Sequence, residues 1–208
     1  MFHCLPTGTA GVGRVVTRAV GVVLVALLTG CANFYVDGTT REVPVAQFKR
    51  VAEPKPVQVL FEFQTKGVVN ARATDHLKSQ VIDQVKASGL FASVDDKPVA
   101  NGSVLSVTLN NVPLTDDAFS KGFVTGLTFG LAGSKVSDGY VCTMTYTDPK
   151  QPNPLVKQAR HAIHTTLGAN SVPTNAAKAD NVESAVRTMT RQVVSNTLND
   201  LSQDVSFK

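Results

Sequence analysis

Ten consecutive apolar residues, Ala19–Leu28 (AVGVVLVALL), decide how much of this 208-residue chain is free to fold into a domain. The segment before them carries Arg14 and Arg18 and no acidic residue, and two small residues follow them. A positive segment, a short apolar run and small residues, in this order, are typical of a secretory signal peptide. A spanning helix needs ~20 apolar residues, about twice this run. The pattern therefore predicts a signal peptide over residues 1–30.

The residues that end this segment, Leu28-Thr29-Gly30-Cys31, resemble the lipobox of bacterial lipoproteins: an aliphatic residue, two small residues and a cysteine. The resemblance implies cleavage between Gly30 and Cys31. It also implies a diacylglyceryl group on the thiol of Cys31 and a fatty acyl chain on its new amino group. Two or more chains anchor a protein stably, whereas one is marginal. The alternative is an ordinary signal peptide followed by a chance cysteine.

The residue after the cysteine bears on the destination of the protein. In Gram-negative lipoproteins an Asp at this position commonly retains the protein at the inner membrane, and this chain has Ala32. The resemblance thus implies an outer-membrane protein, held by its lipid, with the domain facing the periplasm. No cofactor is expected beyond the covalent lipid on Cys31.

Charge and composition exclude one class of partner. Without Arg14 and Arg18 the chain keeps 18 basic and 16 acidic residues, a formal charge of +2. It has no tryptophan and 6% aromatic residues. Such a surface offers neither the basic footprint nor the stacking platform of a nucleic-acid binder, so no nucleic acid is expected as a partner. If Cys4 is cleaved off and Cys31 lipidated, Cys142 is left without a disulfide partner.

The rest of the chain divides into a tether and one domain. Residues 31–55 are expected to be the lipidated cysteine and a tether with little regular structure, because Glu53-Pro-Lys-Pro56 favours an extended run. Residues 56–208 are expected to form a single domain. Within it, apolar residues alternate at Val57, Val59, Phe61 and Phe63, which predicts a strand.

Two helices are predicted from apolar residues at helical spacing. The first covers about 71–88, with Leu77, Val81 and Val85 four apart and Ser88-Gly89 as its stop. The second begins after Asp180, which we expect to cap it together with Glu183. Its predicted buried stripe comprises Val182, Val186, Met189, Val193 and Leu201.

Four more strands are predicted between the helices, at 90–94, 103–110, 140–146 and 155–166. The order β-α-β-β, glycine-rich segment, β-β-α predicts an α+β fold. We expect a mostly antiparallel five-stranded sheet with two amphipathic helices on one face. In its overall plan the chain resembles small α+β envelope lipoproteins that assist secretion, polysaccharide export or outer-membrane assembly.

The glycine-rich segment, residues 122–133, holds a glycine at every fourth position and has no charge between Lys121 and Lys135. Three interpretations stay open: a buried helix or loop that closes the sheet, a surface that meets a membrane or partner, and an anion cradle. Gly133-Ser134-Lys135 has the wrong order for a Walker motif, which disfavours the third. The candidate packing, partner or membrane contacts are Gly122, Phe123, Gly126, Leu127, Gly130 and Leu131.

The sequence contains no pattern of catalytic residues. It has no Gly-x-Ser-x-Gly, His-Glu-x-x-His or Cys-x-x-Cys motif, so we predict no catalytic residue and no metal site. His161 and His164 are three apart on a predicted strand, which places them on opposite faces. The pairs Asp95-Asp96 and Asp116-Asp117 are interpreted as turn or cap residues, and Cys142 as a buried, inert thiol.

These observations lead to two hypotheses and a remoter third. The first is a non-enzymatic accessory or interaction module of an envelope assembly, secretion or export complex, in contact with an envelope protein or a second copy of itself. The second is a lipoprotein that binds a lipid or another small apolar ligand. A cavity under the helices would favour the second, an exposed apolar glycine surface the first. Polar side chains that converge in a cleft would favour the third, an enzyme.

Overall fold

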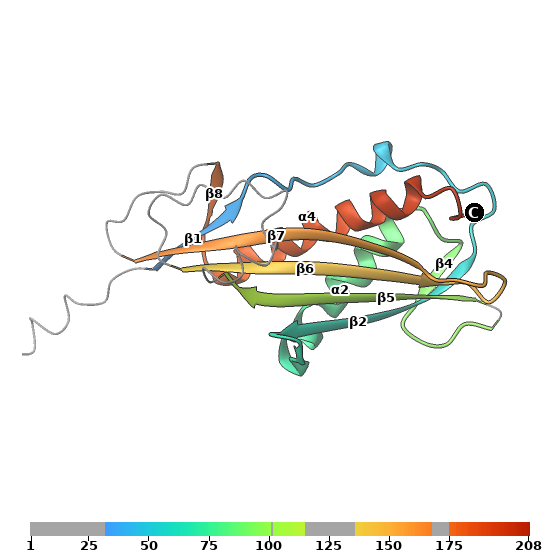
Figure 1. The fold of residues 1–208 in the computed structure, drawn as a ribbon, viewed down its shortest axis with the longest axis horizontal. Helices are drawn as coiled ribbons and strands as arrows, with labels where there is room; N and C mark the ends of the chain where they lie inside the picture. Colours follow the sequence, from blue (N-terminus) through green and yellow to red (C-terminus); the bar gives the residue numbers. More distant parts are fainter. Residues whose placement is uncertain (1–31, 101, 115–135, 168–174) are drawn as a thin grey trace, which may run out of the picture. The chain divides into compact units, whose positions relative to one another are not determined.

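The computed structural model describes residues 32–100, 102–114, 136–167 and 175–208, which Figure 1 draws in colour. In this part the chain has an α+β fold, with two α-helices and one mixed sheet of eight strands. The helices are α2 (Ala71–Ala87) and α4 (Val182–Gln203), and a 3-10 turn, η1, covers Val45–Gln47. The strands are β1 (Ala32–Asp37), β2 (Pro56–Thr65), β3 (Val68–Val69), β4 (Ser93–Asp95), β5 (Ser103–Pro113), β6 (Val136–Thr147), β7 (Leu155–Leu167) and β8 (Ala176–Ala179).

The sheet is mixed because α2 connects two neighbouring strands. β2 runs parallel to β5, from Val57 opposite Ser103 to Thr65 opposite Asn111. Parallel neighbours need a crossover that returns the chain to its starting end, and α2 supplies it. The pairs β5–β6 and β6–β7 are antiparallel. The predicted α+β class is confirmed. The prediction of five mostly antiparallel strands is wrong, since the sheet has eight strands in the order β3-β2-β5-β6-β7-β1-β8, with β4 also on β2.

The expected tether with little regular structure is corrected at residues 32–37, which form β1; in residues 38–55 only η1 is regular. Residues 33–208 form one compact unit, and β1 lies in the sheet between β7 and β8. The chain after β1 then follows α4 (Figure 1). Its backbone N–H groups at Val43 and Lys49 donate to the hydroxyls of Ser195 and Ser202, at 2.9 and 3.1 Å. Hydrogen bonds to helix side chains therefore hold a segment whose own sequence has no strong periodicity.

Both helices begin at asparagine caps. Asn70 accepts from the N–H of Ala73 at 3.1 Å, and α2 ends before Gly89, whose φ of +67° suits glycine, as predicted. The cap of α4 is Asn181, one residue after the predicted Asp180. The side chain of Asn181 accepts from Ser184 N–H at 2.8 Å, and the hydroxyl of Ser184 accepts from Asn181 N–H at 3.2 Å. Ser184 thus takes the capping role that the sequence predicted for Glu183.

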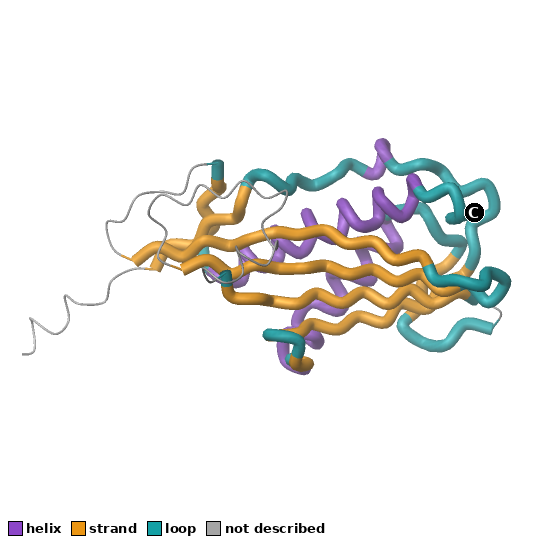
Figure 2. The backbone as a smooth tube through the Cα atoms, viewed as in Figure 1, coloured by secondary structure: helices purple, strands orange, loops and turns teal. Residues whose placement is uncertain are grey.

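Both helices pack on the same face of the sheet (Figure 2). The predicted stripe of α2 is buried at Leu77, Val81 and Val85. The stripe of α4 is buried at Met189, Val193 and Leu201 and partly buried at Val186, but Val182 is 52% exposed because it lies in the first turn. The sheet contributes the other half of the core. Its buried residues are Val57, Val59, Phe61, Phe63, Leu105, Val107, Leu109, Tyr140, Cys142, Met144 and Tyr146.

No described helix covers the opposite side of β2, β5, β6 and β7, which we call the uncovered face. The strand register aligns its residues in rows across the four strands. One row is Leu60, Ser106, Thr145 and Val156; the next is Glu62, Thr108, Thr143 and Gln158. The uncovered face therefore mixes short hydroxyl side chains with two exposed apolar ones, Leu60 at 46% and Val156 at 53%.

Candidate functional site

The residues that the sequence singled out for lipidation and contact lie outside the described residues. This holds for Gly30, Cys31 and the whole glycine-rich group, Gly122, Phe123, Gly126, Leu127, Gly130 and Leu131. It also holds for Asp116-Asp117. Those assignments stay predictions. The structure does define what surrounds the chain immediately after Cys31, because β1 starts at the next residue.

The centre of this region is a buried carboxylate–imidazole pair that joins β1 to β7. The Nε2 atom of His164 lies 3.1 Å from Oδ2 of Asp37, and both residues are 2% exposed. Asp37 also accepts from the N–H of Thr39 at 2.8 Å and from its hydroxyl. Burial alone would raise the pKa of Asp37, but the hydrogen bonds from His164 and Thr39 outweigh it and lower that pKa. The fold therefore keeps Asp37 ionised beside His164.

The second histidine of β7 contacts the helix layer. His161 lies opposite Tyr140 on the helix-covered face, so the two histidines occupy opposite faces as predicted. Its Nδ1 lies 2.8 Å from the backbone nitrogen and 3.2 Å from the carbonyl oxygen of Ala162, and its Nε2 lies 2.7 Å from Oε1 of Gln192 in α4. Burial lowers the pKa of His161, in spite of the bonds to Gln192 and the backbone that raise it.

A cavity of about 680 Å³ opens beside these pairs, between β8, the chain after β1 and the first turns of α4. Its polar and charged lining comprises Asp37, Arg41, Asn175, Lys178, Asp180, Ser184, Thr188 and Gln192. The cavity has the size of a small-ligand site. Its walls are polar and apolar in about equal parts, and the two cations Arg41 and Lys178 are balanced by Asp37 and Asp180.

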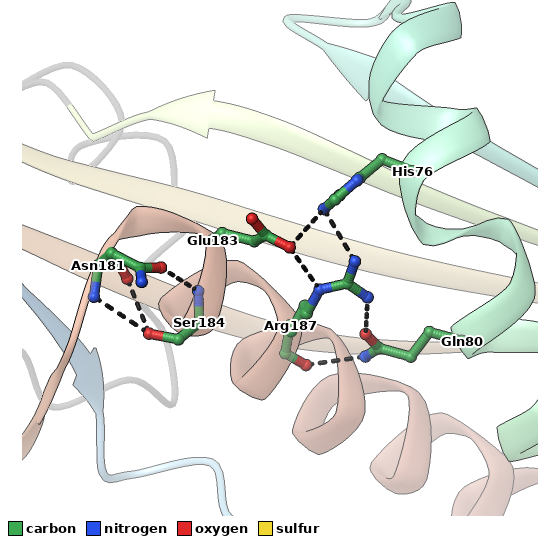
Figure 3. A network of polar contacts seen from close by, with 6 residues as sticks. All are labelled: His76, Gln80, Asn181, Glu183, Ser184 and Arg187. Carbon is green, nitrogen blue, oxygen red and sulfur yellow. Dashed lines mark hydrogen bonds and ion pairs between the residues drawn. The ribbon is translucent and has the colours of Figure 1, made fainter.

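A smaller groove of about 450 Å³ lies between the N-terminal turns of the two helices. Figure 3 shows the polar joint beside it. Arg187 Nε donates to Glu183 at 3.0 Å, and Arg187 Nη2 lies 3.1 Å from His76 Nε2. Gln80 Nε2 donates to the carbonyl of Arg187 at 2.8 Å. Exposed pairs of this kind each contribute about 0–1 kcal/mol. The joint therefore aligns the helices rather than forming a reactive site.

The remaining candidates have structural roles where the structure describes them. Asp95 accepts from the N–H of Lys97 at 2.9 Å, as interpreted from the sequence, whereas Asp96 pairs with Lys78 of α2 at 2.9 Å. Cys142 is fully buried, 3.6 Å from the hydroxyl of Thr197, and burial raises the pKa of its thiol to about 12. Among the described residues, no three His, Cys, Asp or Glu side chains are grouped to hold a metal ion.

Sequence reasoning missed the partners of both histidines. Asp37 lay in the presumed tether, and Gln192 was one of many polar residues of a helix. One signal was present: His161 and His164 enclose Ala162 and Ile163 in a strand, so one histidine had to face the core and needed a polar partner.

Comparison with known proteins adds little to this description. No family model and no curated protein matches the chain. Solved structures with some similarity include a point variant of the PelC dodecamer from Paraburkholderia phytofirmans, at 16% identity and a TM-score of 0.37 over 82% of this chain and 95% of that one. A second PelC dodecamer structure has 15% identity and a TM-score of 0.36, over 81% and 96%. A neuraminyllactose-binding hemagglutinin homolog from Helicobacter pylori has 14% identity and 0.35, over 74% and 86%. Similarity at these TM-scores assigns neither a family nor a function.

Proposed function

We propose that this chain is an outer-membrane lipoprotein whose folded unit is a non-enzymatic interaction module of an envelope assembly, secretion or export complex. The observation that carries the proposal is the complete lipobox Leu28-Thr29-Gly30-Cys31, which precedes every described element. Cleavage before Cys31 would remove residues 1–30 and leave every described strand and helix intact.

The uncovered face supports the role of an interaction module. A sheet usually buries at least one face, and the described helices α2 and α4 cover only one face of this sheet. The row from Leu60 to Val156 leaves two large apolar side chains exposed on the other. The hydroxyl and amide side chains of the uncovered face suit the polar, hydrated rim of a protein–protein interface. No helix among the described residues is long and apolar enough to span a membrane.

The buried histidines favour a structural role over a catalytic one. A general acid or base must reach its substrate within hydrogen-bonding distance. His161 and His164 are 0% and 2% exposed, and each is already paired, with Gln192 and Asp37. Their contacts tie β7 to α4 and to β1. This supports a non-enzymatic protein.

Ligand binding remains the second candidate, supported by the cavity of about 680 Å³. Arg41, Lys178 and Gln192 in its lining would lose hydration against an apolar ligand. A ligand that carries polar groups of its own matches these charged walls better than the lipid or apolar molecule expected from the sequence.

The anchor is tested by feeding cells an alkyne-tagged fatty acid and measuring its incorporation into the purified protein. Wild type should carry the tag and sediment with outer membranes, and Cys31→Ser should lose both properties. Cys4→Ser and Cys142→Ser are the matched controls and should keep the tag, because neither alters the lipobox. Equal labelling of the Cys31→Ser protein would refute the anchor.

The interaction module is tested by mild crosslinking in membranes followed by affinity capture. We expect a stoichiometric envelope protein or second copy, lost when Leu60 and Val156 are both replaced by Glu. Val205→Glu is the control, since Val205 is 79% exposed in the C-terminal tail, away from the uncovered face. Capture that survives the Leu60 and Val156 changes would exclude this face as the contact. A copurifying small molecule without any protein would favour ligand binding.

A further inference from the structure

The start of β1 leaves no spacer between the candidate lipid and the fold. Ala32 follows Cys31 directly and is already the first residue of β1. Phe34, two residues on, pairs with Ala179 of β8. Consecutive residues span at most about 3.6 Å each. The backbone of Phe34 therefore lies within about 11 Å of the backbone of Cys31.

β1 is fixed in the sheet and cannot act as a loose arm. Tyr35 and Val36 are 6% and 4% exposed, and Val36 belongs to the main core. The buried pair of Asp37 with His164 follows, and then the hydroxyl of Thr40 donates to the carbonyl of Arg160 at 2.9 Å. Releasing β1 to create a spacer would break the buried hydrogen bond between Asp37 and His164 and expose core side chains.

The same contacts show at which end of the sheet the strand begins. β1 and the residues after it run antiparallel to β7, because Asp37 contacts His164 and Thr40 contacts Arg160. β1 therefore begins at the end of the sheet where β7 finishes and β6 starts, as Figure 1 shows. The turn between β6 and β7 lies at the opposite end. The 12 residues of β6 separate the two ends by about 40 Å, at ~3.3 Å per residue.

We infer that the lipid bilayer is the partner of this end of the sheet. The start of β1, the start of β6 and the end of β7 lie against the lipid headgroups, and the β6–β7 turn points away from them. The inference rests on the proposed lipid anchor and adds an orientation to it. It also leaves the uncovered face at the side of the molecule, accessible to another protein.

The orientation is tested with two single cysteines in the lipidated full-length protein, each carrying an environment-sensitive fluorophore. Lys178→Cys lies on β8 opposite Tyr35, and Asn153→Cys lies in the β6–β7 turn. Both positions are exposed, and the native Cys142 is buried. Lipid on Cys31 and removal of Cys4 with residues 1–30 then leave only the introduced thiols for labelling. The proteins are reconstituted into phosphatidylcholine–phosphatidylglycerol vesicles whose headgroups carry a short-range quencher.

The label at 178 should lose the greater part of its fluorescence, and the label at 153 should keep nearly all of it. A flexible Gly-Ser spacer inserted between Ala32 and Asn33 should restore the fluorescence at 178, because it lets the fold leave the surface. Quenching at 153 as strong as at 178, in protein that floats with the vesicles, would overturn the orientation and leave the anchor intact. The Cys31→Ser protein should not float with the vesicles. If the wild-type protein also fails to float, both the anchor and the orientation are overturned.

Discussion

Replacing Asp37 by Asn should destabilise the fold more than the other substitutions proposed below. The substitution keeps the size of the side chain but removes the charge that His164 and Thr39 donate to, with His164 Nε2 at 3.1 Å. Breaking a buried pair costs about 3–5 kcal/mol. The amide keeps one acceptor oxygen, so we expect about 3 kcal/mol. In a domain of this size, that lowers Tm by roughly 6–12 °C.

The assay is urea and thermal unfolding of the mature, unlipidated protein at pH 7, with Cys31→Ser in every variant. Asp83→Asn is the control, because Asp83 is 74% exposed and 3.9 Å from Lys86, and it should change stability by less than about 0.5 kcal/mol. The pKa of Asp37 is lowered in the fold. The contribution of ionised Asp37 to the free energy of unfolding is therefore complete above the ordinary carboxyl pKa of about 3.9. It is lost as the pH falls below that value. A cost for Asp37→Asn no larger than the control's would refute the argument that the pair holds β1.

Three further predictions use the same unfolding assay or a chemical probe. Gly38→Ala should lower the free energy of unfolding by about 1–3 kcal/mol, because the new Cβ would lie 2.6 Å from the carbonyl oxygen of Asn175. An unchanged urea midpoint would mean that the backbone around Gly38 and Asn175 shifts to fit the methyl group without loss of stability. Burial lowers the pKa of His161, so the unfolded chain takes up more protons and stability should fall as the pH drops below about 6.5. His161→Gln should flatten that part of the slope between pH 7.5 and 5.5, and an equally steep slope would assign it to other groups. Cys142 should resist iodoacetamide in the folded protein and react in 6 M guanidinium, as read by mass; reaction in native buffer would contradict its burial.

The long elements were predictable because each has a strong period of its own. Alternation from Val57 to Phe63 identified β2, and the spacing of Leu77, Val81 and Val85 identified α2 and its buried face. Gly89 marked the end of α2, since it adopts the left-handed conformation that other residues avoid. The cap of α4 was misplaced by one residue because Asp180 and Asn181 are both good caps and the sequence does not separate them.

The short strands and the pairing depend on contacts far apart in the sequence. β3 and β8 have two and four residues, too few for a period to show. The parallel pairing of β2 with β5 follows from where α2 returns the chain, which local patterns do not contain. Asp37 and His164 are 127 residues apart, and only the fold brings them together. The candidate site was therefore predictable at its histidines but not at their partners.

The central claim, that the fold is tied to a membrane through Cys31, is tested most directly by the mass of the N-terminal peptide of the protein extracted from bacterial membranes. The account predicts a chain that starts at Cys31 and carries a diacylglyceryl group on the sulfur and a fatty acyl group on the amine. A membrane-extracted chain that still contains residues 1–30, or one that begins at an unmodified Cys31, would contradict it.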